Sequence, residues 1–583
     1  MRNVIIAGAV VVAGAAGYFL TQQSGEGNGL SGIMGVEVSP LTYVPADTVF
    51  FSGQLTPFPL KDYLQSTSFT QPQIPQDLLD ELDDGNKPAE RFLTSLLKSY
   101  FVAANSAEEF QKTFALPDQI KAIVYAVGFL PVIRYQVTEE KAFWSLLDKA
   151  ELESGFKHEP RNMGDLTVRA YPLQTGESGT LELIVAYQDD WATWTFNTDV
   201  NTAAELEVAL GLKKPSTSLK DSGIIADIAA KHGFQEQVIS YIDHQGLVKA
   251  LTTTDGNTLA KMLTKAMQVK GGSDQLADIR TPDCQAEMAA MADNWPRTVF
   301  GIHSADDMKI TPEHSFIRMS MVVESNNKVV MDALTSLQGF IPSYLNDAEV
   351  FGYALGVDVN KLGPALGDIW SNMLEPAYKC EPLAEMQMEI REANPAALAM
   401  FTGMAQGVKG VAVGVQDFSL DMSGSEPVMD SLQGLVSLSA DNPEVLFNMA
   451  KSFAPPLAAI QLPADGSAVD LSTFIPIPPE VKVKPMLALK GKHLVIYSGE
   501  SGKATAERLA GEELAGNGLM GFALDYKKLF EPILPVFEAV GDPEMTEQLE
   551  VLKNMDMRTK FGINLTPQGI EMVTEADMRA PKK

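Results

Sequence analysis

The stretch that decides the fold is residues 486–510, MLALKGKHLVIYSGESGKATAERLA. Two apolar runs joined at Lys490-Gly491 are followed by a Gly/Ser-rich segment and a helical pattern. This order is typical of a phosphate-binding loop. That motif, however, requires a glycine where Tyr497 stands and Ser or Thr where Ala504 stands. The sequence therefore does not carry the nucleotide-binding motif.

A second stretch, residues 183–209, repeats this pattern as LIVAYQDDWATWTFNTDVNTAAELEVA. Phe196 corresponds to Tyr497, and Glu205 corresponds to Glu507 after one inserted residue. The earlier copy has neither the glycines nor the lysine of a phosphate loop. Both stretches therefore predict a structural unit, a β-hairpin at 183–196 or 486–497 followed by a helix.

Other segments recur in the same order along the chain. RTVFGI at 297–302 returns as RTKFGI at 558–563, so Phe300 corresponds to Phe561. TVFFSGQLTPFPLKDYL near residue 49 corresponds to EVFGYALGVDVNKLGPAL near residue 349.

The repeats predict two tandem homologous halves, residues 40–330 and 343–579, with residues 326–348 as the crossover between them. Alternating strands with helices between them predict an α+β fold, in which helices pack on a mainly antiparallel sheet in each half.

A strand-to-helix junction also recurs, where apolar strands end at Thr56, Asp243, Asp358 and Asp525. Repeated aspartates suggest catalytic acids, but Thr and Asp also accept hydrogen bonds from the free N–H groups at a helix start. Since Thr replaces Asp in one junction, we interpret these four residues as helix caps.

The N-terminus predicts a membrane anchor. Residues 4–20 form an uncharged run after Arg2, and the next basic residue is Lys61. This charge asymmetry favours a cytoplasmic N-terminus and an exported body. We expect a signal-anchor helix at 1–20, a Gly/Ser-rich flexible tether at 21–39 and a single-pass protein of the inner membrane with its body in the periplasm. Cleavage at Ala13-Gly14-Ala15 is the alternative.

The charge and the motifs exclude several classes of function. The chain of 583 residues has a formal net charge of −30, which repels nucleic acid phosphates and anionic lipid headgroups, so we expect neither as a partner. No sequence motif predicts a catalytic residue, a metal site or a cofactor. The histidines lack metal-ligand spacing, and His303 and His314 flank a predicted turn. Arg297 and Arg558 recur at matching strand starts, where we expect salt bridges rather than an anion site.

Methionine gives the strongest sequence indication of a binding surface. This flexible side chain is clustered at Met373, in EMQMEI at 385–390 and in LAMFTGM at 398–404. Methionine suits adaptable apolar grooves and also fills cores. A groove for lipid or unfolded chains and plain core packing are the two interpretations.

Cys284 and Cys380 are the two cysteines of the chain. Each stands at a predicted helix start, one in each predicted half, and an exported body meets an oxidising compartment. We therefore predict a Cys284–Cys380 disulfide that joins the two halves. A reactive thiol pair and two separate buried thiols are the alternatives.

The chain resembles a bacterial family of unknown function. The segments that carry the resemblance are YVPADTVFF, VIRYQVTEEKAFWSLL, GLKKPSTSLKDSGIIADI and VISYIDHQGLVKAL. Members of that family are exported or membrane-anchored, with a Pro-Ala-Asp opening and repeated strand-helix modules. The resemblance implies an envelope location and an α+β repeat fold, but it implies no site residues.

Together these patterns favour a non-catalytic, membrane-tethered periplasmic binding or scaffold protein of the bacterial envelope. Its expected partners are the cytoplasmic membrane, through residues 4–20, and an envelope protein or hydrophobic ligand. A carrier or chaperone for lipid or lipoprotein with an apolar cavity is the alternative. An enzyme with a site built from scattered acidic residues is the less favoured one.

Overall fold

The computed structural model describes residues 39–67, 87–104, 106–176, 179–269, 275–393, 395, 402–403, 405–422, 427–478, 481–540 and 555–580. The predicted anchor at 1–20 and nearly all of the predicted tether lie outside these residues. Among the described residues, no helix combines the length and the apolar character that a bilayer crossing requires.

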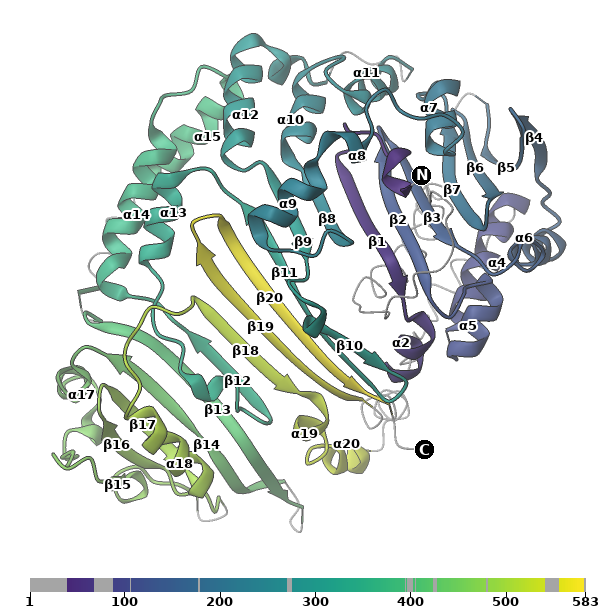
Figure 1. The fold of residues 1–583 in the computed structure, drawn as a ribbon. Helices are drawn as coiled ribbons and strands as arrows, with labels where there is room; N and C mark the ends of the chain where they lie inside the picture. The colour runs from purple at the N-terminus through teal and green to yellow at the C-terminus, as the bar shows by residue number, and fades with distance from the viewer. Residues whose placement is uncertain are drawn as a thin grey trace. The chain divides into compact units, whose positions relative to one another are not determined.

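The chain forms two compact units, each an antiparallel sheet with helices packed on it (Figure 1). Among the described residues, the first comprises those from 39 to 324 together with 379–382, and the second comprises those of 325–378 and of 383–580. The predicted α+β class is confirmed in this form, because all the strand pairings within the described residues of each unit are antiparallel.

The strands of the first unit pair in the order β4-β5-β6-β7-β3-β2-β1-β8-β9-β11-β10. Their bounds are β1 (Phe50–Phe58), β2 (Ile120–Val127), β3 (Leu130–Gln136), β4 (Glu159–Met163), β5 (Leu166–Gln174), β6 (Leu181–Gln188), β7 (Trp191–Thr198), β8 (Val238–Asp243), β9 (Arg297–Gly301), β10 (Met308–Thr311) and β11 (His314–Glu324).

The helices of the first unit are η1 (Pro40–Thr42), α2 (Leu60–Ser66), α4 (Pro88–Ala103), α5 (Ala107–Phe114), α6 (Glu140–Ser154), α7 (Ala203–Ala209), α8 (Leu219–Ser222), α9 (Ile224–His232), α10 (His244–Thr252), α11 (Thr258–Val269), η2 (Ala277–Arg280), α12 (Pro282–Asn294) and η3 (Ala305–Asp307). Ile225 and Ile228 of α9 belong to the same buried cluster as Tyr241 of β8 and Val299 of β9. Figure 1 shows α9 over these two strands.

The strands of the second unit pair in the order β15-β16-β17-β14-β13-β12-β18-β19-β20. Their bounds are β12 (Phe351–Leu355), β13 (Val408–Asp421), β14 (Val428–Ala440), β15 (Val469–Asp470), β16 (Met486–Lys490), β17 (His493–Ser498), β18 (Met520–Asp525), β19 (Asp556–Thr566) and β20 (Gly569–Arg579).

The helices of the second unit are α13 (Lys328–Ser336), η4 (Ser343–Leu345), α14 (Val359–Leu374), α15 (Glu381–Glu392), α17 (Pro443–Ala450), η6 (Pro455–Leu457), η7 (Leu471–Thr473), α18 (Gly499–Leu509), α19 (Tyr526–Phe530) and α20 (Leu534–Val540). Of these, α15 begins inside the segment that groups with the first unit. The predicted crossover at 326–348 contains α13 and η4.

The two strand orders correspond. The run β5-β6-β7-β3-β2-β1-β8-β9-β11 of the first unit has the same sequence of connections as β15-β16-β17-β14-β13-β12-β18-β19-β20 of the second. Phe300 pairs with Ser240 on one side and Met321 on the other, and Phe561 pairs with Phe522 and Thr574 in the matching places. Equivalent positions in the two units can therefore be read from strand order and register.

Both quoted stretches fold as predicted, into the hairpins β6–β7 and β16–β17 followed by α7 and α18. Asp189 and Asp190 have positive φ at one turn, and Gly491 has positive φ at the other. The glycines that suggested a phosphate loop lie in α18. A Cβ on Gly502 would lie 2.4 Å from the backbone oxygen of Gly434, so glycine lets the helix approach β14 closely.

Three of the four predicted helix caps stand at an N-cap, and two of these three make the capping side-chain hydrogen bond. The side chains of Asp358 and Asp525 accept hydrogen bonds from backbone N–H groups of α14 and α19, and Asp243 stands at the N-cap of α10. The prediction for Thr56 is wrong, because β1 continues to Phe58 and α2 begins after Pro59. The Thr56 hydroxyl instead accepts a hydrogen bond from the Gln54 side chain in the strand.

Candidate functional site

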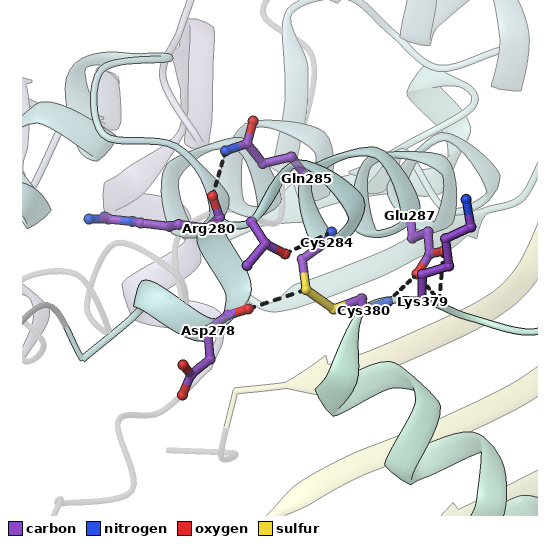
Figure 2. Close-up of a disulfide and its surroundings, with 8 residues drawn as sticks. Asp278, Arg280, Cys284, Gln285, Glu287, Lys379 and Cys380 are labelled. Carbon is purple, nitrogen blue, oxygen red and sulfur yellow. Dashed lines mark hydrogen bonds between the residues drawn. A yellow bond between two sulfur atoms is a disulfide. The ribbon is translucent and has the colours of Figure 1, made fainter.

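The predicted disulfide is present between Cys284 and Cys380, whose Cα atoms lie 4.6 Å apart (Figure 2). Cys284 lies in the first turn of α12, where its N–H donates to the Thr281 hydroxyl. The Glu287 carboxylate accepts hydrogen bonds from the N–H groups of Lys379 and Cys380. Both cysteines are buried. The disulfide and the hydrogen bonds of the Glu287 carboxylate together hold the segment 379–382 on α12.

This geometry corrects one part of the prediction. We expected the two cysteines to lie in different halves, but the segment Lys379–Pro382 groups with the first unit by its contacts. Sequence position alone could not show this, because the residues on both sides of 379–382 belong to the second unit and only these four group with the first. A structural disulfide is typical of compartments outside the cytoplasm, in agreement with an exported body.

The recurrent arginines differ in their contacts. The guanidinium of Arg297 donates to Glu324 and to Asp227, so the predicted salt bridge is present. Arg558 donates instead to the backbone oxygens of Asn346 and Ala348. Both arginines are engaged by groups of the protein, and neither presents an obvious anion site.

Sequence reasoning missed a buried charge cluster around Glu324, whose side chain is fully inaccessible to solvent. Its carboxylate lies 2.7 Å from Nε2 of His232, 3.1 Å from Nε of Arg297 and 3.3 Å from Nζ of Lys231. Burial alone would raise the pKa of Glu324, but the His232 hydrogen bond and the charges of Arg297 and Lys231 lower it to about 2. The cluster fastens α9 to β9 and β11, and we assign it a structural role.

Of the clustered methionines, Met373, Met386 and Met388 have exposed side chains. The core-packing interpretation is therefore wrong for these three. Met400 and Met404 lie outside the described residues. Among the exposed large apolar side chains of the described residues, most belong to the second unit.

The second unit carries a sheet face that is both apolar and accessible. It consists of three rows of directly paired residues, which we call the apolar face. The rows are Leu494-Leu438-Val411-Leu355-Met520-Ile563-Met572, Ile496-Val436-Val413-Tyr353-Phe522-Phe561-Thr574 and Val415-Phe351-Leu524-Thr559-Ala576. Every one of these side chains is exposed or half-buried, and Val436, at 52% exposed, is the most open of the large ones.

On the opposite side of the central strands β12, β13 and β18, the residues are buried although they are small. Ala354, Ala412, Ser437 and Ala523 are each 5% exposed or less, and α18 and η4 pack over this side. Tyr344 of η4 fits into the space that these small residues leave, and its hydroxyl lies 2.9 Å from that of Ser437.

The accessible side of this sheet is therefore apolar, and the buried side of its central strands is made of small residues. An antiparallel sheet with one accessible face ordinarily presents polar side chains there. Here the accessible face carries Val, Leu, Ile, Phe and Tyr. The buried side carries Gly and Ala on β12, β13 and β18, and larger side chains such as Leu435, Val495 and Tyr497 on β14 and β17. A continuous apolar surface of this kind marks a binding site in soluble proteins.

A pocket of about 360 Å³ opens on the buried side of β18, β19 and β20. Its walls include Lys560 and Glu575, whose charged atoms lie 3.6 Å apart, and the floor includes Gly562. A Cβ on Gly562 would meet only one atom, the Met520 backbone oxygen at 3.8 Å.

The first unit shows how this pocket arises. Val299 and Val322 are the register equivalents of Lys560 and Glu575, and both are buried. A Cβ on Gly301, the equivalent of Gly562, would lie 2.5 Å from the ring of Phe234, which follows α9. In the second unit the described residues 510–519 form no helix between α18 and β18. The pocket therefore lies where α9 packs in the first unit.

Metal chemistry has no evident site in the described part of the chain, which contains no group of three or more His, Cys, Asp or Glu side chains able to share an ion. Comparison of the chain with known protein families, with curated proteins and with solved structures finds no match in any of the three. The apolar face is therefore the candidate functional site, because its rows of apolar side chains are accessible to solvent.

Proposed function

We propose that this protein is a non-catalytic binding protein of the bacterial cell envelope, and that it holds an apolar partner on the apolar face of its second unit. Residues 4–20 would tether it to the cytoplasmic membrane, with the body in the periplasm. The observation that carries the proposal is the apolar face, because exposed side chains such as Val411, Val436 and Leu355 cost free energy until a partner covers them.

The two corresponding strand orders support a further part of the proposal, namely that the units arose from one ancestral module by duplication. The first unit carries α9 on its sheet, where Val299 and Val322 are buried. In the described part of the second unit no helix takes this place, and apolar side chains are presented on the other side of the sheet. We propose that the second unit has diverged into the binding module.

An apolar cavity between sheet and helices, as a carrier would use, receives less support. The pocket on that side is lined in part by Lys560, Glu575, Glu512 and Asn517. Such a polar lining suits an apolar ligand poorly, because charged groups lose hydration when the ligand covers them.

Site-specific photo-crosslinking in cells tests the proposal. A benzophenone amino acid replaces Val436 on the apolar face of the full-length protein. In a control variant it replaces Leu152 of α6, which is 85% exposed in the first unit. We expect a covalent adduct with another molecule at position 436 and none above background at position 152. Equal yields at the two positions, or no adduct at 436, would contradict the proposed binding role.

A further inference from the structure

The dimensions of the apolar face limit what can cover it. Strands in a sheet are about 4.8 Å apart, so the two rows that cross seven strands are each about 29 Å long. The third row crosses five strands and is about 19 Å long. Three rows of alternate residues add about 13 Å in the other direction. The face thus covers roughly 350 Å² in projection.

This area argues against a second copy of the chain as the occupant. A stable protein interface buries about 800 Å² on each partner, roughly twice the projected area of the face. Two copies of a chain with a net charge of −30 also repel each other. Neither consideration disfavours an occupant that is small and uncharged where it touches the sheet.

The chemistry of the face favours hydrocarbon. Among the residues of its three rows, the hydroxyls of Tyr353, Thr559 and Thr574 are the side-chain groups able to hydrogen-bond, and none is charged. A partner with polar groups would lose hydrogen bonds to water without replacing them. An acyl chain loses none. The flexible side chains of Met520 and Met572 at one edge can adapt to its path.

The length of an acyl chain also suits the face. The hydrocarbon core of a bilayer is about 30 Å thick and two chains deep, so one chain reaches about 15 Å. A chain of this length, laid along a row, would cross about four of the seven strands. Both chains of one lipid can therefore lie on the face, with the headgroup at its edge.

We infer that the apolar face binds the acyl chains of a membrane phospholipid, laid across β17, β14, β13, β12, β18, β19 and β20. This inference rests on the proposed function and deepens it, since the predicted anchor would keep the body beside a supply of this ligand. The pocket on the other side of the sheet takes no part.

The experiment uses the full-length protein in its own membrane. Cells take up a long-chain fatty acid that carries a diazirine, which is incorporated into phospholipid, and light attaches the probe to any protein group it touches. Peptides of the purified protein are then examined by mass spectrometry. We expect adducts of phospholipid mass on peptides from β12, β13 and β14.

Two variants sharpen the result. In Val413→Asp/Phe522→Asp, two carboxylates replace the half-buried side chains on either side of Tyr353 in the middle row. Because the chains would then cover unpaired charges, we expect labelling of the face to fall at least about tenfold. The control, Leu152→Asp, places a charge on an exposed leucine of the first unit and should leave labelling unchanged. An unchanged circular dichroism spectrum and an unchanged unfolding midpoint establish that each variant folds.

The outcomes separate the inference from the proposed function. Phospholipid adducts that are confined to the face and lost in the double variant support both. If position 436 crosslinks only to a protein and the lipid probe leaves the face unlabelled, the proposed function stands and the phospholipid assignment fails. The mass of that adduct then distinguishes an acylated protein from a second copy of this chain. Lipid labels only outside the face would overturn the inference, and the absence of every adduct would overturn both.

Discussion

At the scale of single residues, Glu324 shows how a buried charge can be accommodated in an acidic protein. Three basic side chains, His232, Arg297 and Lys231, surround one carboxylate, and they come from α9 and β9. Removing one partner of a buried ionic group leaves the others uncompensated, which costs more than the intact group contributes. The cluster should therefore be sensitive both to substitution and to acid.

We predict that Glu324→Gln destabilises the first unit by about 3 kcal/mol at neutral pH, because Arg297 and Lys231 lose their buried countercharge. Hydrogen exchange of the amides in β9 and β11 measures this locally. Asp306→Asn, at a fully exposed carboxylate, is the control and should leave the exchange rates of β9 and β11 as they are. Equal protection in wild type and Glu324→Gln would show that the cluster contributes nothing.

The same residue predicts a pH dependence. The pKa of Glu324 is lowered to about 2 in the folded protein, against about 4.3 in an unfolded chain. A lowered carboxyl pKa stabilises the fold above the unfolded value, and this stabilisation is lost as the pH falls from about 4 through 2. Urea midpoints measured from pH 7 to pH 2 should therefore fall more steeply for wild type than for Glu324→Gln. Parallel curves would contradict the assignment.

At the scale of elements, close packing explains a glycine of α18 that the sequence pattern associated with a phosphate-binding loop. Gly502 of α18 lies against the backbone of Gly434, whereas a Cβ on Gly367 of α14 would have no atom within 4 Å. Both are helical glycines, and only their surroundings differ. A single substitution should therefore have opposite effects at the two positions.

We predict that Gly502→Ala destabilises the second unit by about 2 kcal/mol, because α18 must move away from β14 to admit the methyl group. Gly367→Ala, the matched control, should stabilise α14 by up to about 1 kcal/mol through its higher helix propensity. Chemical denaturation of both variants measures the two effects. A loss of stability at both positions would show that the close contact of α18 with β14 does not explain the effect of Gly502→Ala.

The disulfide connects two elements, α12 and the segment that leads into α15. For Cys284→Ser/Cys380→Ser we predict a loss of at most about 4–5 kcal/mol, since the bond closes a loop between residues 96 apart. Unfolding midpoints of the variant and wild type measure the loss. Alkylation of unreduced, denatured wild-type protein should modify neither cysteine, and two labelled thiols would disprove the bond.

Local patterns in the sequence predict the elements well. The hairpins β6–β7 and β16–β17 and their following helices depend on contacts between near neighbours, so residues 183–209 and 486–510 specify them directly. The prediction fails at Thr56 because an apolar strand gives no sign of where its pairing ends. The sequence pattern therefore assigned a helix cap to Thr56, which the structure places inside β1.

At the scale of the whole molecule, the candidate site could not be predicted from sequence. In FGYAL at 351–355, alternation separates Phe351, Tyr353 and Leu355 from Gly352 and Ala354, but it does not say which set is buried. The usual rule assigns the large apolar set to the core. The structure buries the small set instead, because Tyr344 and α18 approach that side. The rows then join strands up to about 230 residues apart in the chain.

The location of the protein is the remaining prediction at this scale. We expect the full-length chain to stay with the membrane after a high-salt wash, and its intact mass to include residues 1–20. Release by salt, or a mature chain that begins near residue 16, would favour cleavage instead. A variant without residues 1–38 provides the control and should remain in the supernatant.

The disulfide also changes what a single break in the chain would do. The boundary between the units, at Glu324 and Ser325, lies inside the loop that Cys284 and Cys380 close. A protease that cuts once anywhere in this loop therefore leaves two fragments that remain covalently joined. On a gel the nicked protein would show two bands only after reduction. Nicking at the boundary would then not, by itself, release the second unit from the first.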